Sequence, residues 1–164
     1  MSKKYSGYIV GNGHNSSNLE SFNRIIDASN FLSLFCAILL INNESYFNID
    51  KLKNFINYCQ LFNRFQELLN NIYPFDEKYN SFDKAITILK LNGYVKEFRY
   101  KQNENAQIAN RIIIIGKKFD IKEILRNNKL KITDTLNLVE EFDAYCIDSV
   151  EYFKSKMKKK TKKV

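Results

Sequence analysis

The segment SFDKAITILKLNGYVKEFRY, Ser81 to Tyr100, changes from the periodicity of a helix to that of a strand across one glycine. Apolar side chains recur three or four residues apart up to Leu91, and apolar and charged residues alternate after Gly93. Ser81 is a suitable N-cap, and Gly93 stands where helices commonly end in a left-handed residue. A helix that turns directly into a strand predicts an α+β fold.

A β-hairpin is expected after Gly93. The polar turn QNENAQ separates the first strand from the apolar run IANRIIIIG. Tyr94, Phe98 and Tyr100 alternate with polar residues, which predicts that they pack against the helices. The alternative is that these rings stack on nucleic-acid bases. The four consecutive isoleucines suggest a strand that is buried on both faces.

The rest of the chain has mostly helical patterns. One Pro and five Gly also favour helices over a loop-rich β fold. We expect a buried helix over about 19–41, a helix capped by Asn48 or Asp50, a helical pattern over about 62–72, a short helix capped by Asp120, and one long helix over about 133–157. The predicted fold is therefore α+β and mostly α.

These patterns divide the chain into four predicted parts. We expect a flexible N-terminal arm over 1–18, a folded domain over 19–132, a C-terminal helix over 133–157 and a lysine-rich tail over 158–164. The longest apolar run, FLSLFCAILLI, is shorter than the ~18–20 residues that a membrane span needs. With no recognisable secretory signal, the sequence predicts a soluble, cytoplasmic protein that does not contact a membrane.

The order of helices, a capped helix closed by NGYV and a polar-tipped hairpin is similar to a winged-helix domain, over about residues 20–116. The resemblance implies a winged-helix-like core in which the helix before Gly93 reads DNA and the hairpin is the wing. The implied DNA contacts are Lys84, Thr87 and Lys90 on the helix and Lys96, Arg99, Lys101 and Arg111 on the wing. That helix has no arginine to grip guanine, and its Asp83 would repel phosphate, so it is a poor reading head.

Most of the positive charge lies at the C-terminus. The formal net charge is +8, but seven of the 26 basic residues lie in KSKMKKKTKKV, and the remainder is nearly balanced by 18 acidic residues. Lys158, Lys159 and Lys160 are candidates for non-specific attraction to phosphates. The alternative is a well-solvated helix end without a ligand.

The residue set for catalysis is missing from the sequence. The chain has one histidine, His14, in the polar segment GNGHNSS, and three widely spaced cysteines without metal-ligand spacing. The bare GxG in GNGH lacks the lysine of a phosphate loop. Asp76–Glu77 and Glu140–Glu141 read as exposed polar pairs. We therefore expect a protein that is not an enzyme and needs no cofactor or metal.

A second resemblance spans the whole layout. The apolar N-terminal helices, the helix KLKNFINYC, the stretch ending in GYV and the final helix LVEEFDAYC resemble the middle component of three-component ABC-ATPase antiphage defence systems. That resemblance implies a bacterial adaptor that links an SMC-like ATPase to an effector. The apolar stripe of the last helix would be the protein interface, or would pack within the chain: Val139, Phe142, Val150, Phe153 and Met157.

Two other functions remain open from the sequence. One is a winged-helix transcriptional regulator that binds DNA through the wing and the lysine tail. The other is a phage-encoded inhibitor that uses the same surface to block a host protein. The expected partners are therefore one or more proteins, with an SMC-like ATPase or a second copy of this chain as candidates, and DNA as a weaker one.

Overall fold

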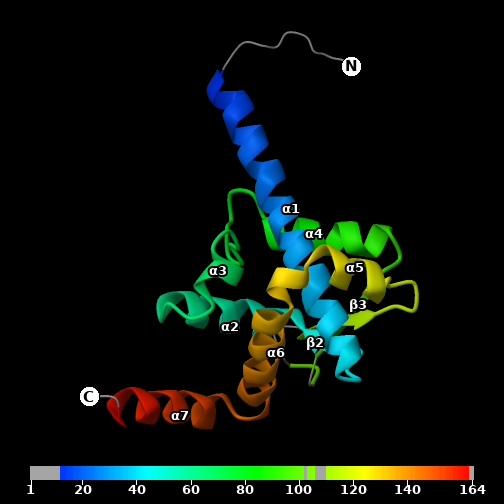
Figure 1. Cartoon of the computed structure of the whole chain (residues 1–164). Helices are drawn as coiled ribbons and strands as arrows, with labels where there is room; N and C mark the ends of the chain where they lie inside the picture. The colour runs from blue at the N-terminus through cyan, green and yellow to red at the C-terminus, as the bar shows by residue number, and fades with distance from the viewer. Residues whose placement is uncertain (1–11, 102, 106–109, 163–164) are drawn as a thin grey trace.

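The computed structural model describes residues 12–101, 103–105 and 110–162, and the side chains of 12–17 and 157–162 are outside this description. Figure 1 shows the arrangement of the elements. In chain order they are α1 (Asn12–Ile41), β2 (Tyr46–Asn48), α2 (Ile49–Leu61), α3 (Gln66–Leu69), α4 (Ser81–Leu91), β3 (Val95–Tyr100), β4 (Asn110–Ile115), α5 (Ile121–Asn127), the 3-10 turn η2 (Lys129–Lys131), α6 (Ile132–Ile147) and α7 (Ser149–Lys162). The predicted mostly helical α+β class is confirmed.

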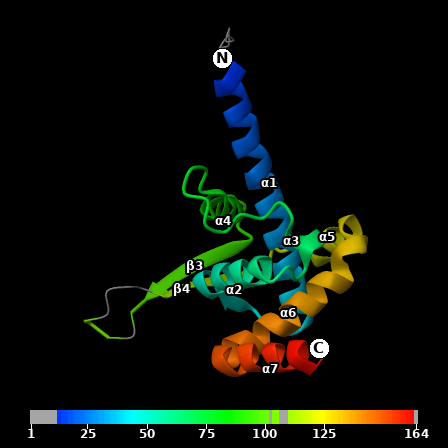
Figure 2. The ribbon, with the colours of Figure 1, turned by 90° about the vertical axis from the view of Figure 1, so that its left-hand side faces the viewer.

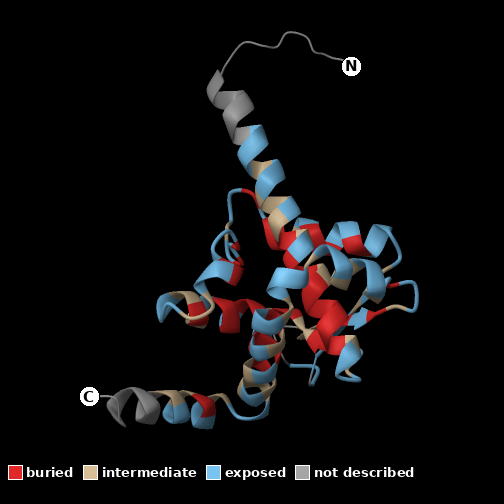
Figure 3. Ribbon diagram, in the orientation of Figure 1, coloured by how far each residue is buried: buried red, intermediate tan, exposed pale blue. Residues whose placement is uncertain are grey.

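Helix α1 is the centre of the fold, and its two halves differ. From Ala28 onward nearly every apolar side chain is buried, whereas the first half extends out of the body (Figures 1 and 3). The helix begins at Asn12, earlier than the predicted start near residue 19. Adding residues to a formed helix costs far less than nucleating one, so the buried half can support a polar extension. Residues 1–11 of the predicted arm lie outside the described residues.

By length and composition, the segment Asn18–Ile41 of α1 could cross a membrane. Half of its most apolar stretch is buried inside the protein, and the core helix of a soluble protein meets the same criteria. The helix is therefore weak evidence for a membrane span. The sequence prediction was based on the continuous apolar run from Phe31 to Ile41. The candidate segment also includes the preceding helical turns, in which polar and apolar residues are mixed.

In the described part of the chain, β2, β4 and β3 form an antiparallel sheet in that order. Phe47 pairs with Ile113, and Val95 pairs with Ile115. The predicted hairpin is confirmed, and Figure 2 shows it pointing away from the body. Strand β2 was not predicted, because three residues are too short for an alternating pattern.

Helices cover one face of this sheet. Tyr94, just before β3, packs against the core as predicted, but the predicted packing of Phe98 and Tyr100 against the helices is wrong. Val95 and Ile113 point to the core, while Phe98 is 56% exposed, Tyr100 is 43% exposed and Ile114 is 41% exposed. The isoleucine run is therefore not buried on both faces. Alternation along a strand separates two faces, but it does not tell which face the helices will cover.

The segment between α2 and α4 is mostly irregular, and of the helical pattern predicted over about 62–72 the described structure forms the short helix α3 (Gln66–Leu69). Asn63 and Phe65 adopt left-handed backbone conformations with φ of 56° and 54°. The Gln60 side chain donates hydrogen bonds to the carbonyls of Leu69 and Ile72, which replaces helical pairing in this turn. A helical spacing of apolar residues does not show these side chain–backbone contacts.

Two of the three predicted N-caps are confirmed. Asn48 accepts hydrogen bonds from the backbone amides of Asp50 and Lys51, and Asp120 accepts one from Glu123. Ser81 is instead the first residue of α4 and is buried. Its amide donates to the Asp76 carboxylate at 3.0 Å.

The predicted single C-terminal helix is wrong, because the chain breaks at Asp148. Asp148 is extended, and its carboxylate accepts a hydrogen bond from the Glu151 amide at the start of α7. Helix α7 turns away from the direction of α6 (Figure 1). The turn brings Tyr152 into the core, where it is 5% exposed.

Gly93 ends α4 as predicted, and replacing it with alanine should destabilise the protein by about 1–2 kcal/mol. Its φ is 75°, and the amides of Gly93 and Tyr94 bond back to Lys90 and Leu89. An added Cβ would meet Lys118 Cδ at an ordinary 3.5 Å, so the cost is backbone strain. Chemical denaturation measures it. Gly93→Asn, which tolerates this conformation, should lose less, and equal losses would contradict the explanation.

Candidate functional site

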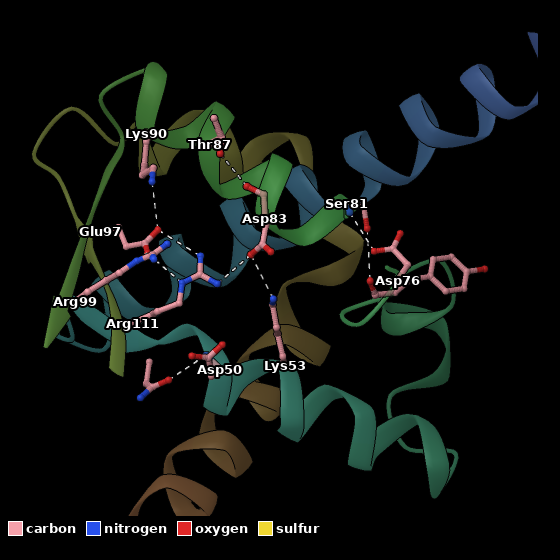
Figure 4. A network of polar contacts seen from close by, with 12 residues as sticks. Asp50, Lys53, Asp76, Ser81, Asp83, Thr87, Lys90, Glu97, Arg99 and Arg111 are labelled. Atoms are coloured by element: carbon pink, nitrogen blue, oxygen red, sulfur yellow. Dashed lines mark hydrogen bonds and ion pairs between the residues drawn. The ribbon is translucent and has the colours of Figure 1, made fainter. Parts of the chain in front are cut away.

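A network of ion pairs joins α4 to the hairpin (Figure 4). Arg111 on β4 donates from Nη1 to Asp83 of α4 at 3.1 Å. The same guanidinium donates from Nε and Nη2 to the Glu97 carboxylate of β3 at 3.0 and 3.3 Å. Both sides of its donor fork are therefore engaged within the chain.

Three further cations complete this network. Lys53 of α2 lies 3.3 Å from Asp83, Lys90 of α4 lies 3.2 Å from Glu97, and Arg99 Nε lies 2.6 Å from Glu97. The Glu97 side chain is only 6% exposed. The carboxylates of Asp83 and Glu97 thus join α2, α4, β3 and β4. These contacts fix the position of α4 over the sheet.

The pKa values in the network reflect these contacts. The hydrogen bond from Arg111, with further bonds from Arg99 and Lys90, outweighs burial and lowers the pKa of Glu97 to about 2. Burial acts to raise the pKa of Asp83, but Lys53 and Arg111 outweigh it and the net shift is downward. Both carboxyls therefore stay ionised at neutral pH and neutralise part of the positive charge of this region.

The residues predicted to contact DNA do not form one surface. Lys84 and Thr87 are exposed on α4, although the Thr87 hydroxyl donates to the backbone carbonyl of Asp83. Lys90, Arg99 and Arg111 are held by Glu97, whereas Lys96 is exposed on the other face of the sheet and Lys101 is exposed just beyond the end of β3. The side chains of Lys158, Lys159 and Lys160 lie outside the described residues. The helix predicted to read DNA thus has part of its polar face occupied by its own hairpin.

A second polar cluster fixes α7. Glu141 of α6 pairs with Arg64, accepts the Tyr152 hydroxyl at 2.8 Å, and lies 3.3 Å from Lys156. Burial acts to raise the pKa of Glu141, but the Tyr152 hydrogen bond and the two cations lower it overall. Burial and this carboxylate raise the pKa of Tyr152. The first half of α7 is therefore part of the folded body.

The predicted protein interface on the last helix is largely internal. Val139 and Phe142 are buried, and the Phe142 ring lies 5.6 Å from both Phe35 and Phe55. Phe153 is partly buried, with its ring 4.6 Å from that of Tyr58. Val150 is 60% exposed, and the side chain of Met157 lies outside the description. Because the break at Asp148 rotates α7, the stripe does not continue as one face.

An apolar stripe that the sequence did not single out lies on the projecting half of α1. Leu19 and Phe22 are 60% and 59% exposed, and Ile26 is 39% exposed. Residues at this spacing share one side of a helix. Figure 3 shows this part of α1 standing clear of the other elements. The sequence pattern assigned these residues to the core, because a helical stripe does not reveal where a neighbouring element ends.

The other side of the same helical turns is tied to the loop before α4. Arg24 lies 3.1 Å from Glu20 and stacks over the Tyr73 ring at 3.8 Å. The Tyr79 hydroxyl donates to Glu20 at 2.9 Å. These contacts hold the first half of α1 in place and leave its apolar stripe uncovered.

The described residues contain no group of three or more His, Cys, Asp or Glu that could hold a metal. Burial raises the pKa of the Cys36 and Cys59 thiols, the latter to about 12. Burial, with a hydrogen bond to the Asp143 carboxyl, raises the pKa of Glu44 to about 7. His14 falls within α1, but its side chain lies outside the description.

Comparisons with protein-family models, curated proteins and solved structures found no match.

The ion-pair network should make the free energy of unfolding depend on pH. The folded pKa of Glu97 is about 2 against an ordinary 4.5, so its contribution is complete above about pH 4.5 and disappears as the pH falls towards 2. Glu97→Gln should therefore lower the free energy of unfolding by about 1–2 kcal/mol at pH 7, a value reduced for solvent screening. The deficit should shrink by pH 3.

Melting curves of both proteins between pH 7 and pH 3 measure this effect. Glu104→Gln, at the exposed tip of the hairpin, is the matched control and should follow the unchanged chain. A deficit for Glu97→Gln that is constant with pH would contradict the electrostatic explanation.

Phe142→Ala should destabilise the protein by about 3–5 kcal/mol, because it leaves a cavity between α1, α2 and α6. Val150→Ala, at a position that is 60% exposed, should change stability by less than about 0.5 kcal/mol. Urea denaturation distinguishes the two. Similar small effects would show that Phe142 is not a core residue.

Proposed function

We propose that this protein is a non-enzymatic adaptor with a winged-helix-like core. The order α1, β2, α2, α4, β3 and β4, with the hairpin beside α4, agrees with the winged-helix resemblance of the sequence. The added elements α5, α6 and α7 pack on the same core. Such a scaffold acts through the surfaces that it offers to other molecules.

The observation that carries the adaptor function is the uncovered stripe Leu19, Phe22 and Ile26. A rigid helix that projects from the body and exposes apolar side chains is suited to packing against a partner helix or groove. Charged neighbours do not obstruct the contact, because Glu20 and Arg24 are paired on the other side of the helix. The stripe therefore gives the chain a docking element that its own fold does not use.

The partner that we propose is a protein of the same bacterial complex, an SMC-like ABC ATPase of an antiphage defence system, with the adaptor linking it to an effector in the cytoplasm. This assignment follows the resemblance in layout to the middle components of such systems. A transcriptional regulator is the less favoured function, because Arg111, the best-placed arginine for a bidentate base contact, already holds Asp83 and Glu97.

Replacing the stripe should abolish partner binding without unfolding the protein. The variant Leu19→Ala, Phe22→Ala, Ile26→Ala keeps the helix propensity of α1 and removes exposed side chains alone. Co-purification with the proteins encoded beside it should fall at least about tenfold, since central apolar anchors contribute most of the binding energy of an interface.

The matched control is Leu130→Ala, because Leu130 is 98% exposed and belongs to η2, outside the stripe. It should keep full binding. Undiminished binding by the triple variant would refute the assignment of this stripe, and an unchanged chain that captures none of the neighbouring proteins would refute the adaptor function. Light scattering would reveal a second copy of the chain as the occupant.

A further inference from the structure

The outer face of the sheet is an uncovered surface on the far side from the helices. Tyr46 pairs with Ile114, which pairs with Lys96 on the other side, and Ile112 pairs with Phe98. Paired residues in a sheet point to the same face. Each residue of these pairs is next in sequence to one that faces the core, namely Phe47, Ile113 or Val95, or alternates with them along its strand. The even-numbered strand residues therefore share the outer face.

Aromatic side chains dominate what this face exposes. Tyr46 is 63% exposed, Phe98 is 56% exposed and Tyr100 is 43% exposed. The Phe98 and Tyr100 rings lie 6.1 Å apart and are inclined by 28°, so two nearly parallel rings stand side by side along β3. Exposed rings in this arrangement form a platform on which other flat groups can stack.

The charge on this face is positive. Lys96 is exposed on β3, two residues before Phe98 and across Ile114 from Tyr46. The described strand residues that point to this face include no Asp or Glu. Glu97 points to the opposite face, where Arg111 holds it. The face is therefore complementary to a ligand that combines planar apolar groups with negative charge.

We propose that the outer face binds single-stranded nucleic acid, with bases stacked on Phe98, Tyr100 and Tyr46 and phosphates beside Lys96. Single strands present free base faces and a charged backbone together, which is the combination that aromatic, basic sheet surfaces accept. In a duplex the base faces are hidden. This binding is separate from the adaptor function, which uses α1.

The presence of Lys96 on this face favours nucleic acid over a protein partner. Protein–protein interfaces are depleted of lysine relative to the rest of the surface, because a compact, strongly hydrated charge is costly to bury there. Lys96 lies on the edge strand β3, two residues before Phe98 on the same face and across Ile114 from Tyr46. A phosphate group beside a base gives this ammonium group a partner.

Fluorescence anisotropy with labelled oligothymidine of about 15 nucleotides tests the proposal on the full chain. Phe98→Ala with Tyr100→Ala should weaken binding by about tenfold or more. Phe75→Ala, a substitution of a 53% exposed phenylalanine in the loop before α4, is the matched control and should not weaken it. A duplex of the same length should bind more weakly than the single strand.

A second variant distinguishes the contribution of the lysine tail to binding from that of the outer face. Lys158→Gln, Lys159→Gln, Lys160→Gln should weaken binding most at low salt, since it removes phosphate contacts alone. The loss caused by removing Phe98 and Tyr100 should persist in that background. Disappearance of all binding with the tail lysines would overturn the proposal.

A tryptophan placed on the face reports stacking directly, because the chain contains no other tryptophan. The fluorescence of Phe98→Trp should be quenched by oligothymidine, and that of Phe75→Trp should not. This measurement decides the question even if the double alanine variant melts at a lower temperature than the unchanged chain.

Three further results would overturn the proposal. The first is unchanged affinity in the Phe98→Ala, Tyr100→Ala variant, and the second is absence of quenching in Phe98→Trp. The third is no oligonucleotide binding together with loss of a co-purifying protein in the double alanine variant, which would make this face a protein docking surface.

Discussion

Burial of the second half of α1 is the constraint on which the other elements depend. Phe35 is fully buried, and its ring lies 5.1 Å from Phe47 of β2 and 5.6 Å from Phe142 of α6. Burying one such side chain contributes about 1.5–3 kcal/mol, and a run of them from Phe31 to Leu39 anchors the sheet and the helices to one axis. The first half of α1 has no such neighbours, and its apolar residues remain in contact with solvent.

The one-sided sheet explains two features that seem unrelated in sequence. On the covered face, the apolar core residues are followed towards the tip of the hairpin by Arg111 and Glu97. The charges of these two residues are paired, because they lie against α4. On the open face, the same strands expose Phe98 and Tyr100. Strand β3 thus contributes Glu97 to the ion pairs on one face, and it contributes Phe98 and Tyr100 to the exposed aromatic platform on the other. Odd-numbered residues face the helices and even-numbered residues face outward.

Pairing of charges within the chain bears directly on function. An arginine whose donors already hold two carboxylates would have to break those bonds before it could read a base. Among the described residues that the sequence predicted to contact DNA, Lys84, Lys96 and Lys101 are exposed and lie outside this network, on α4, on β3 and just beyond β3. This distribution supports a scaffold that docks proteins through α1 and attracts a flexible anionic strand to its sheet, in preference to a protein that reads duplex DNA through α4.

The sequence alone determined the elements whose causes are local. The left-handed Gly93 after α4, the Asn48 and Asp120 caps, the hairpin and the mostly helical class all follow from side chains within a few residues of each other. Of the candidate site, the sequence identified the charged residues of α4 and the hairpin, but not their partners. The sequence also identified the Phe98 and Tyr100 rings, but it predicted that they face the helices, whereas they lie on the open face.

Tertiary structure decided everything that depends on which surface meets another. The pairing of Arg111 with Asp83 joins residues 28 positions apart, and the burial of Phe142 depends on Phe35 and Phe55 from earlier helices. A periodic pattern divides a helix or strand into two sides, but both sides of the α1 extension and of β3 carry apolar residues. Which side is covered is settled by the packing of distant elements, and so the exposed stripe of α1 and the open face of the sheet emerged only from the folded chain.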